Sequence, residues 1–150
     1  MIRNDSGLET REDIIQQLKK AGLKITPQRL AIVEVLIENG SLHPGAGFIY
    51  KKAKKIKKTL SLSTTYSILD EFSRLGIIKK LQFDRMENRY ETNAEEHINL
   101  ICEGCGKILD YQVVSRVDWK NAERKTGFSI KDTRLECYGY CRECLKGSPD

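Results

Sequence analysis

The feature that most constrains this chain is a doubled Cys-x-x-Cys motif. Cys102 and Cys105 form the first pair, and Cys141 and Cys144 form the second. Each pair can present two thiolates from a tight turn, and two such turns can close over a single tetrahedral zinc ion. Because thiolates would fill every coordination position, the sequence predicts a structural zinc site whose binding energy contributes to folding.

The same cysteines leave an alternative open. A thiol–disulfide redox protein would need at least one Cys-x-x-Cys pair to be metal-free and reactive. Neither pair precedes a convincing amphipathic helix pattern, and this favours zinc. The fifth cysteine, Cys137, lies outside both pairs in a strand-like segment, and we predict it to be a small core residue. Titration of the thiols under native conditions separates the two possibilities, because bound zinc protects four of the five cysteines.

Length and composition indicate a soluble protein of one medium or two small domains. The chain has 150 residues, of which 39% are hydrophobic and 31% charged. No apolar run approaches the ~20 residues of a membrane span, and the polar start, MIRNDSGLETRED, lacks the apolar stretch of a secretory signal. We therefore expect a cytoplasmic protein without membrane contact, in which cysteines more often bind metal than form disulfides.

Positive charge is concentrated in the first part of the chain. Residues 1–92 carry a net charge of +6, and residues 93–150 carry −1. Six lysines fall within residues 51–58, a density that can neutralise phosphates but that also suits a solvated helix face. We predict two domains, a DNA-binding domain of residues 1–92 and a second domain of residues 93–150.

Apolar periodicity predicts several helices and then a small hairpin in the first domain. Helices are expected over residues 10–21, 27–39 and 48–56 and from about residue 62 to the residue before Gly76. Thr26 is the expected cap of the second helix, and Ser61 or Ser63 that of the fourth. The third helix is expected to turn Phe48, Ile49, Ala53 and Ile56 inward. With the extended runs IIKKLQF and NRYET, this order is typical of a winged helix-turn-helix, whose last helix enters the major groove.

From residue 97 the pattern changes to short strands. HINLIC and KILDYQVV are predicted strands, residues 116–126 a short helix, and FSIKDTRLECYGYC a long strand. The predicted fold class is therefore α+β, with an N-terminal winged helix-turn-helix, a linker near residues 92–96 and a small α/β domain that carries the zinc site.

The order of these motifs resembles the ferric uptake regulator family, and most closely its peroxide-sensing repressor branch. The segments that carry the resemblance are GLKITPQRLAIVEVL, HP, LSLSTTYSILDEFSRLGIIKKL, NRYET, HINLICEGCGKILDY and YGYCREC, which together span roughly residues 20–145. The resemblance implies a dimeric, metal-dependent transcription regulator rather than an enzyme, with a C-terminal dimerisation domain. It also implies a structural zinc on the paired cysteines.

The resemblance further implies a regulatory Fe(II) or Mn(II) site between the domains. Its ligand positions fall on His43, Glu91, His97, Asn99 and Asp110. Nitrogen and carboxylate donors suit these ions, whereas thiolates would suit zinc better. His97 and Asn99 are two residues apart, so they face the same side of a strand. A shared ion would fix the angle between the domains and so couple metal binding to DNA binding.

Asn99 stands where the family usually has the second histidine of a His-x-His pair. An amide oxygen is a weaker Fe(II) ligand than imidazole, so either Asn99 binds the ion or the site has four ligands and an open position that would admit peroxide. A further histidine-rich site of the family is not supported, because Glu96, Asp132 and Thr133 occupy the places of its histidines. We therefore expect one regulatory site per protomer.

In the family, the helix that carries Ser-x-x-Thr-x-Tyr reads the operator. The predicted DNA contacts here are Arg29, Ser61, Ser63, Thr64, Thr65 and Tyr66. The serines and threonines also suit plain N-capping, and the two roles are compatible. Asp70 departs from the family pattern, because an acid near phosphates lowers affinity unless it faces a cytosine or a lysine.

Together these inferences describe a homodimeric, zinc-stabilised repressor of a pseudo-palindromic operator, with Fe(II) or Mn(II) as co-repressor. In the peroxide-sensing interpretation, Fe(II) reacts with hydrogen peroxide, the oxidant modifies His43 or His97, and the metal then leaves. The closest alternative is an iron-uptake regulator that reports only the Fe(II) level, and Glu91 is more typical of that branch. A zinc-ribbon scaffold that binds only protein is an alternative of another class, and it predicts no salt-dependent affinity for palindromic DNA.

Overall fold

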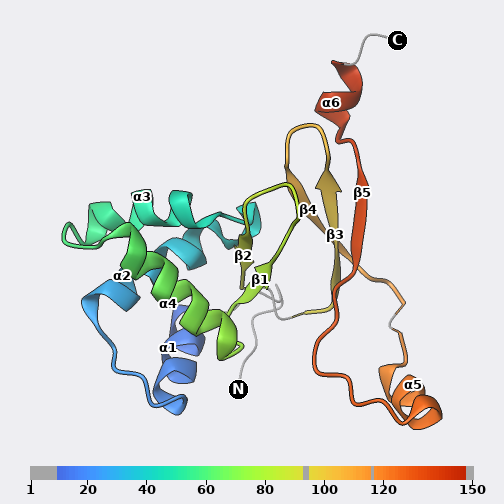
Figure 1. The fold of residues 1–150 in the computed structure, drawn as a ribbon, viewed down its shortest axis with the longest axis horizontal. Coiled ribbons are helices and arrows are strands. Elements are labelled where there is room, and N and C mark those ends of the chain that lie inside the picture. The colour runs from blue at the N-terminus through green and yellow to red at the C-terminus, as the bar shows by residue number, and fades with distance from the viewer. Residues whose placement is uncertain (1–9, 93–94, 116, 148–150) are drawn as a thin grey trace. The chain divides into compact units, whose positions relative to one another are not determined.

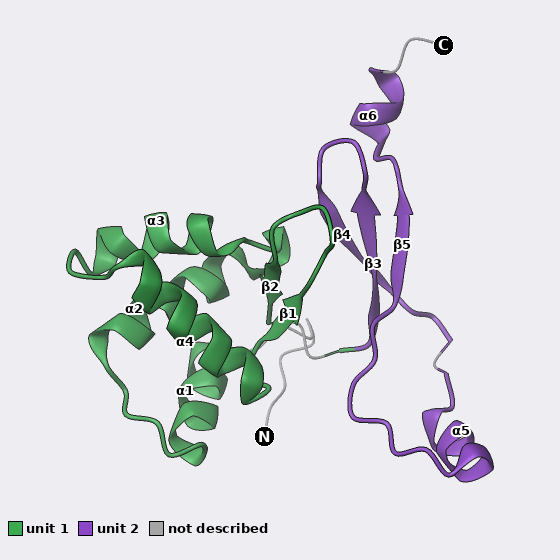
Figure 2. Cartoon of the chain, in the orientation of Figure 1, with its two compact units in different colours: residues 1–95 green, residues 96–150 purple. Residues whose placement is uncertain are grey.

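The computed structural model describes residues 10–92, 95–115 and 117–147. The chain divides into two compact units, unit 1 (residues 1–95) and unit 2 (residues 96–150) (Figure 2). This division lies three residues beyond the boundary predicted after residue 92. Residues 93 and 94 of the predicted linker lie outside the described residues.

Unit 1 is built from helices. The helices are α1 (Arg11–Lys20), α2 (Pro27–Asn39), the 3-10 helix η1 (Gly40–Leu42), α3 (Ala46–Ile56) and α4 (Leu62–Arg74) (Figure 1). Side-chain caps specify the first turns of α1, α2 and α4. Thr10 caps α1 and Thr26 caps α2. Ser61, rather than Ser63, caps α4 by accepting a hydrogen bond from the backbone N–H of Thr64 at 3.1 Å.

Side chains from all four α-helices of unit 1 form its hydrophobic core. The buried set includes Ile14 and Leu18 of α1, Ile32 and Leu36 of α2, Ile49 and Ala53 of α3, and Leu69 and Phe72 of α4. The prediction that Phe48 and Ile56 also face inward is wrong, because these side chains are 38% and 57% exposed. Since α3 begins at Ala46, its buried stripe follows Ala46, Ile49 and Ala53, and Ile56 is its last residue.

A short hairpin completes unit 1. Strands β1 (Lys79–Leu81) and β2 (Arg89–Glu91) pair in antiparallel fashion. Tyr90 is buried and joins the helical core. Gly45, just before α3, forms an isolated bridge with Arg89. The hairpin is therefore the wing of a winged helix-turn-helix, as the sequence predicts.

Unit 2 contains a three-stranded sheet of order β4–β3–β5. Its elements are β3 (His97–Cys102), β4 (Ile108–Gln112), α5 (Trp119–Thr126), β5 (Glu136–Gly139) and α6 (Arg142–Lys146) (Figure 1). Strand β3 is antiparallel to β4 and parallel to β5, and the crossover between β4 and β5 contains α5. The parallel pairing sets Cys102 opposite Gly139, so the ends of β3 and β5 that carry cysteine motifs lie together.

Two expectations for the secondary structure of unit 2 are wrong. The long strand predicted over residues 128–141 shrinks to β5, because only residues 136–139 pair with β3, and alternation alone does not supply a partner strand. The second cysteine pair is not in a bare turn, since Cys141 is the N-cap of α6. In the part of the chain that the structure describes, no helix combines the length and the apolar character that crossing a bilayer requires.

Candidate metal centres

Unit 2 brings the two Cys-x-x-Cys pairs into one cluster. One sulfur from each of Cys102, Cys105, Cys141 and Cys144 lies within 4.8 Å of the other three. The Sγ atoms of Cys105 and Cys141 are 3.7 Å apart. Zn–S bonds of about 2.3 Å in a tetrahedron separate the sulfurs by about 3.8 Å. The cluster therefore has the dimensions of a four-thiolate zinc site.

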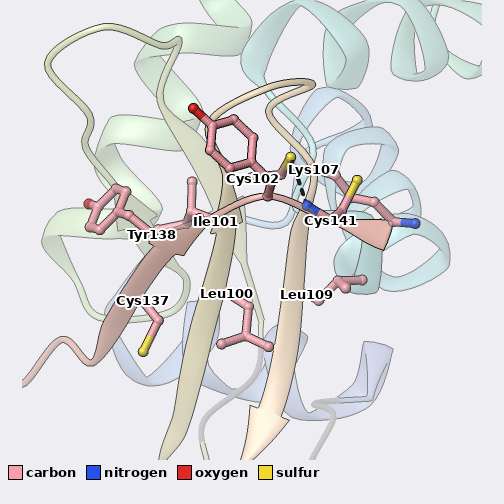
Figure 3. A pocket seen from close by; sticks show the side chains of 10 residues that line it. Leu100, Ile101, Cys102, Lys107, Leu109, Cys137, Tyr138 and Cys141 are labelled. Atoms are coloured by element: carbon pink, nitrogen blue, oxygen red, sulfur yellow. Dashed lines mark hydrogen bonds between the residues drawn. The ribbon is translucent and has the colours of Figure 1, made fainter. Parts of the chain in front are cut away.

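Backbone hydrogen bonds prepare this cluster for a cation. The N–H of Cys141 donates to Sγ of Cys102 at 3.2 Å (Figure 3). Hydrogen bonds from the backbone of Cys105 and Cys141 lower the pKa of Cys102 to about 6. The neighbouring thiols, Cys102 first, raise the pKa of Cys144 to about 12. One thiolate thus forms readily and discourages the next, so a bound dication is needed to hold all the sulfurs as thiolates together.

Gly104, between the first two cysteines, leaves the space that Cys144 occupies. A Cβ at this position would lie 2.8 Å from Sγ and 3.2 Å from Cβ of Cys144. We expect Gly104→Ala to weaken zinc binding by roughly tenfold or more, because a displaced ligand distorts the tetrahedron. Competition with a chromogenic chelator measures this loss. Gly139→Ala is the matched control, since a Cβ there meets nothing within 4 Å, and equal zinc retention by both variants would contradict the prediction.

Unit 1 pairs two of the predicted regulatory ligands. Nε2 of His43 lies 3.3 Å from Oε2 of Glu91, and the side chains are 0% and 1% exposed. His43 follows η1 in a left-handed backbone conformation, with φ 49° and ψ 64°. This conformation is uncommon for a residue other than glycine, and it often marks a functional constraint.

Unit 2 gathers the other three predicted ligands on one face of its sheet. Asn99 on β3 is directly opposite Asp110 on β4, and Nε2 of His97 lies 3.7 Å from Oδ1 of Asp110. The Oδ1 atom of Asn99 is buried, and no hydrogen bond from the described residues reaches it. A buried carbonyl-type oxygen without a donor beside a histidine and a carboxylate suits a hard or borderline cation.

The first turns of α4 present the residues predicted to contact DNA. Ser61 and Ser63 are exposed, as is Tyr66 at 47%. Thr64 is partly exposed, and its Oγ1 accepts a hydrogen bond from Ser61. Thr65 differs, because its side chain is fully buried and donates to the Ser61 carbonyl at 2.9 Å. Thr65 therefore stabilises the helix and the core.

Two charged residues near α4 are held in ion pairs within unit 1. Arg29 donates to Glu71 through Nη2 at 2.9 Å and to the Lys24 carbonyl through Nη1 at 2.8 Å. The guanidinium of Arg29 thus joins α2 to α4. Asp70, the acid that departs from the family pattern, lies 3.0 Å from Nζ of Lys80 on β1. This lysine offsets the negative charge of Asp70 beside the predicted DNA contacts.

Comparison with known proteins places this architecture in a family. The model of the ferric uptake regulator family matches residues 20–138. The chain belongs to the ferric uptake regulator family. Among curated relatives, the peroxide-responsive repressor PerR of Staphylococcus epidermidis is 39% identical over 135 residues, which cover 89% of each chain.

The fold of the chain matches solved structures of ferric uptake regulators and of PerR proteins. The Helicobacter pylori ferric uptake regulator Fur, whose structure is described as revealing three functional metal binding sites, matches at a TM-score of 0.73 and 27% identity. That match covers 99% of this chain and 100% of the other. PerR from Streptococcus pyogenes matches at a TM-score of 0.51 and 29% identity over 91% of this chain and 94% of that one.

The donor atoms of this member of the ferric uptake regulator family suit two kinds of metal. The sulfur cluster suits structural zinc in size and chemistry. The imidazole, carboxylate and amide donors suit a regulatory Fe(II) or Mn(II).

Cys137 does not take the core position that the sequence predicts. Its thiol is exposed, so the prediction of a small core residue is wrong. The register sets Leu100 beside both Leu109 and Cys137, and the three side chains point to the same side of the sheet (Figure 3). Leu100 is 36% and Leu109 44% exposed, so this face of the sheet is apolar and accessible.

Proposed function

We propose that the protein is a homodimeric transcriptional repressor that binds its operator with Fe(II) or Mn(II) and releases it after reaction with hydrogen peroxide. The observation that carries the proposal is the presence of one set of nitrogen and oxygen donors in each unit, all buried except Asp110, in a chain of the ferric uptake regulator family. The peroxide-responsive repressors among the relatives, at 37–39% identity, support peroxide as the signal.

In this proposal one ion joins the two donor sets. Unit 1 contributes His43 and Glu91, and unit 2 contributes His97, Asp110 and Asn99. Neither set alone supplies the number of ligands that Fe(II) or Mn(II) prefers, and each contains nitrogen and oxygen donors of the right kind. An ion held by both units would restrict the angle between them, and a dimer fits two successive major grooves only at a suitable angle.

The zinc has a separate role in the proposal. Cys102, Cys105, Cys141 and Cys144 are the proposed ligands. With thiolates at every position the zinc has no place for peroxide or another exchangeable ligand. It stabilises the unit through which the chain dimerises, and the regulatory ion alone responds to the signal.

The buried histidines determine what peroxide would do. A bound Fe(II) would promote cleavage of the O–O bond of hydrogen peroxide beside its ligands. Overall the peroxide is the two-electron oxidant: one of its oxygens is inserted into a ring C–H bond of a histidine and the other leaves as water. His43 is 0% and His97 8% exposed, so an oxidant formed beside them meets an imidazole before it meets bulk water. Addition of oxygen to either ring removes a nitrogen donor, and the two units are then no longer held at the DNA-binding angle.

The DNA-binding surface is proposed to combine α4 with the lysines of α3. On α4, the exposed residues Ser61, Ser63 and Tyr66 and the partly exposed Thr64 can reach base edges and phosphates. The exposed lysines of this surface are Lys51, Lys52, Lys54 and Lys55 in α3 and Lys58 just after it. Arg29 is proposed to act at this surface by fixing α4 through Glu71. Phosphate contacts by these lysines would make binding fall steeply with salt.

The homodimer is proposed to form through unit 2. The exposed side chains Leu100, Leu109 and Tyr111 lie on one face of the sheet, as the strand registers require. A second copy of the chain would cover this face and supply the buried apolar area that a single unit lacks.

The proposal is tested by mass spectrometry of the peptides that contain His43 and His97. The zinc-loaded protein is given Fe(II) without oxygen and then a small excess of hydrogen peroxide, beside a Mn(II)-loaded control. We expect one added oxygen atom on either histidine with Fe(II) only. If both histidines stay unmodified while iron is bound and operator binding is intact, the protein is instead a reversible sensor of the Fe(II) level.

A further inference from the structure

We propose that Arg89 is a positioning residue that ties the backbone of His43 to the wing, so that metal binding orders the wing itself. This inference rests on the proposed role of His43 as a regulatory ligand. It adds a second route from metal to DNA, which runs inside unit 1 and does not depend on the angle between the units.

The residues around His43 are bonded to the wing strand one after another. Nη1 of Arg89 donates to the carbonyl of His43 at 3.2 Å. The next residue, Pro44, accepts a hydrogen bond from the Tyr90 N–H at 3.0 Å. Gly45 then forms a bridge with Arg89. The segment 43–45 is thus held against β2 by one side-chain hydrogen bond, one backbone hydrogen bond and one isolated bridge.

The side chains of the wing reinforce this backbone pairing. Glu91, at the end of β2, faces the His43 ring at 3.3 Å. Glu87, in the wing turn, lies 3.7 Å from Nε of Arg89, and its carboxylate lies over Gly45 where a side chain would otherwise be. The guanidinium of Arg89 therefore connects the turn of the wing to the carbonyl of His43.

The backbone conformation of His43 explains why such a connection is needed. A left-handed histidine at φ 49° persists only when its surroundings hold it. The hydrogen bond from Arg89 holds the carbonyl side of this residue, and the N–H side donates to the Gly40 carbonyl at 3.1 Å. A metal on the imidazole and Arg89 on the carbonyl would therefore stabilise the same conformation, each strengthening the other.

The same segment leads directly into the DNA-binding surface. Gly45 is the N-cap of α3, the helix that carries the exposed lysines. The wing is the other element that flanks the recognition helix α4 in this fold. When His43 is fixed, the start of α3 and strand β2 are fixed with it. The wing then loses less conformational entropy on binding DNA.

Arg89→Gln tests the inference, with Arg85→Gln as the matched control. Arg85 is an exposed residue of the wing turn, so both variants lose one positive charge from the same hairpin. Mn(II) affinity is measured by titration, and hydrogen–deuterium exchange of residues 82–91 is measured with and without Mn(II). We expect Arg89→Gln to bind Mn(II) about tenfold more weakly and to lose the Mn(II)-induced protection of the wing. Arg85→Gln should keep both, and all variants should keep their zinc.

Arg89→Lys provides the conservative variant, because a lysine ammonium can reach the carbonyl of His43 but cannot also bind Glu87 in the guanidinium geometry. We expect it to restore part of the Mn(II) affinity and of the wing protection. Wild-type Mn(II) affinity and wing protection in both Arg89 variants would overturn the inference. If the wild-type protein shows no Mn(II)-dependent operator binding at all, it is the proposed function that fails.

Discussion

A His43→Ala variant is expected to lose metal-dependent operator binding while it keeps its zinc and its dimer. The imidazole is fully buried beside Glu91, so its removal deletes a proposed regulatory ligand and leaves a carboxylate without its neighbouring ring. The loss of Mn(II) affinity should exceed the roughly 10–100-fold that mutation of an outer-shell partner causes. Operator affinity at moderate Mn(II) should then fall by about 5–150-fold, the usual range of allosteric coupling. Fluorescence anisotropy with a labelled operator measures this at fixed salt.

The left-handed backbone at His43 requires a second variant. Alanine is strained at φ 49°, whereas asparagine tolerates this region well. His43→Asn therefore removes the imidazole with little added strain, and because an amide oxygen is a weaker ligand than imidazole, we expect Mn(II)-dependent binding to weaken, though less than in His43→Ala. Zinc content and dimer mass are read in parallel. Loss of zinc or of the dimer in His43→Asn would show that His43 does not belong to a separate regulatory site.

Cys141→Ser is expected to unfold unit 2 and abolish dimerisation. Structural zinc contributes about 10–16 kcal/mol of apparent binding energy in small zinc domains, comparable to the whole stability of a typical domain. Within the described residues, the buried hydrophobic side chains of unit 2 are Ile101, Cys102 and Ile108, which lie in β3 and β4 close to the cluster. A sheet with so small a core depends on the ion. Loss of zinc, of strand signal in circular dichroism and of the dimer in gel filtration should occur together.

Cys137→Ser is the control for this experiment, since its thiol is exposed and lies outside the cluster. It should keep zinc, fold and dimer. Native thiol titration of the wild-type protein should find four cysteines protected by zinc and one, Cys137, that reacts slowly because the proposed dimer covers the face of the sheet on which it lies. A folded, dimeric Cys141→Ser protein with a fast-reacting Cys-x-x-Cys pair would instead favour the thiol–disulfide alternative.

Local signals in the sequence predicted the helices of unit 1 well. Thr26 with Pro27, and Ser61 ahead of an apolar stripe, specify helix starts through contacts a few residues long. The exposure of Phe48 and Ile56 could not be predicted in the same way. Which side chains of α3 are buried depends on where the helix begins and on which helices pack against it. The strand predicted over residues 128–141 failed for a related reason, since pairing with β3 limits it to residues 136–139.

In the candidate sites too, residues marked by a local sequence pattern were predicted and residues that act through long-range contacts were not. The spacing of the cysteines predicted the sulfur cluster without any knowledge of the fold, and the alternation of β3 predicted the shared face of His97 and Asn99. Arg89 and Gly104 were missed as supporting residues. The Arg89 contact joins residues 46 positions apart in the chain, and the need for Gly104 arises only when Cys144 packs against it. No local pattern in the sequence marks either position.

Because β3 pairs in parallel with β5, the zinc cluster can form only after the chain has been synthesised almost to its last residues. During synthesis domains fold in order from the N-terminus, so the winged helix can form while later residues are still absent. Cys102 and Cys105 cannot complete the cluster until Cys141 and Cys144 have been synthesised, and these two follow the last strand of the sheet in the chain. A chain whose translation stops before residue 141 would hold a folded DNA-binding unit but only half of its zinc ligands. With dimerisation through unit 2 as proposed, such a fragment is expected to stay monomeric and so to compete poorly with intact repressor for the operator.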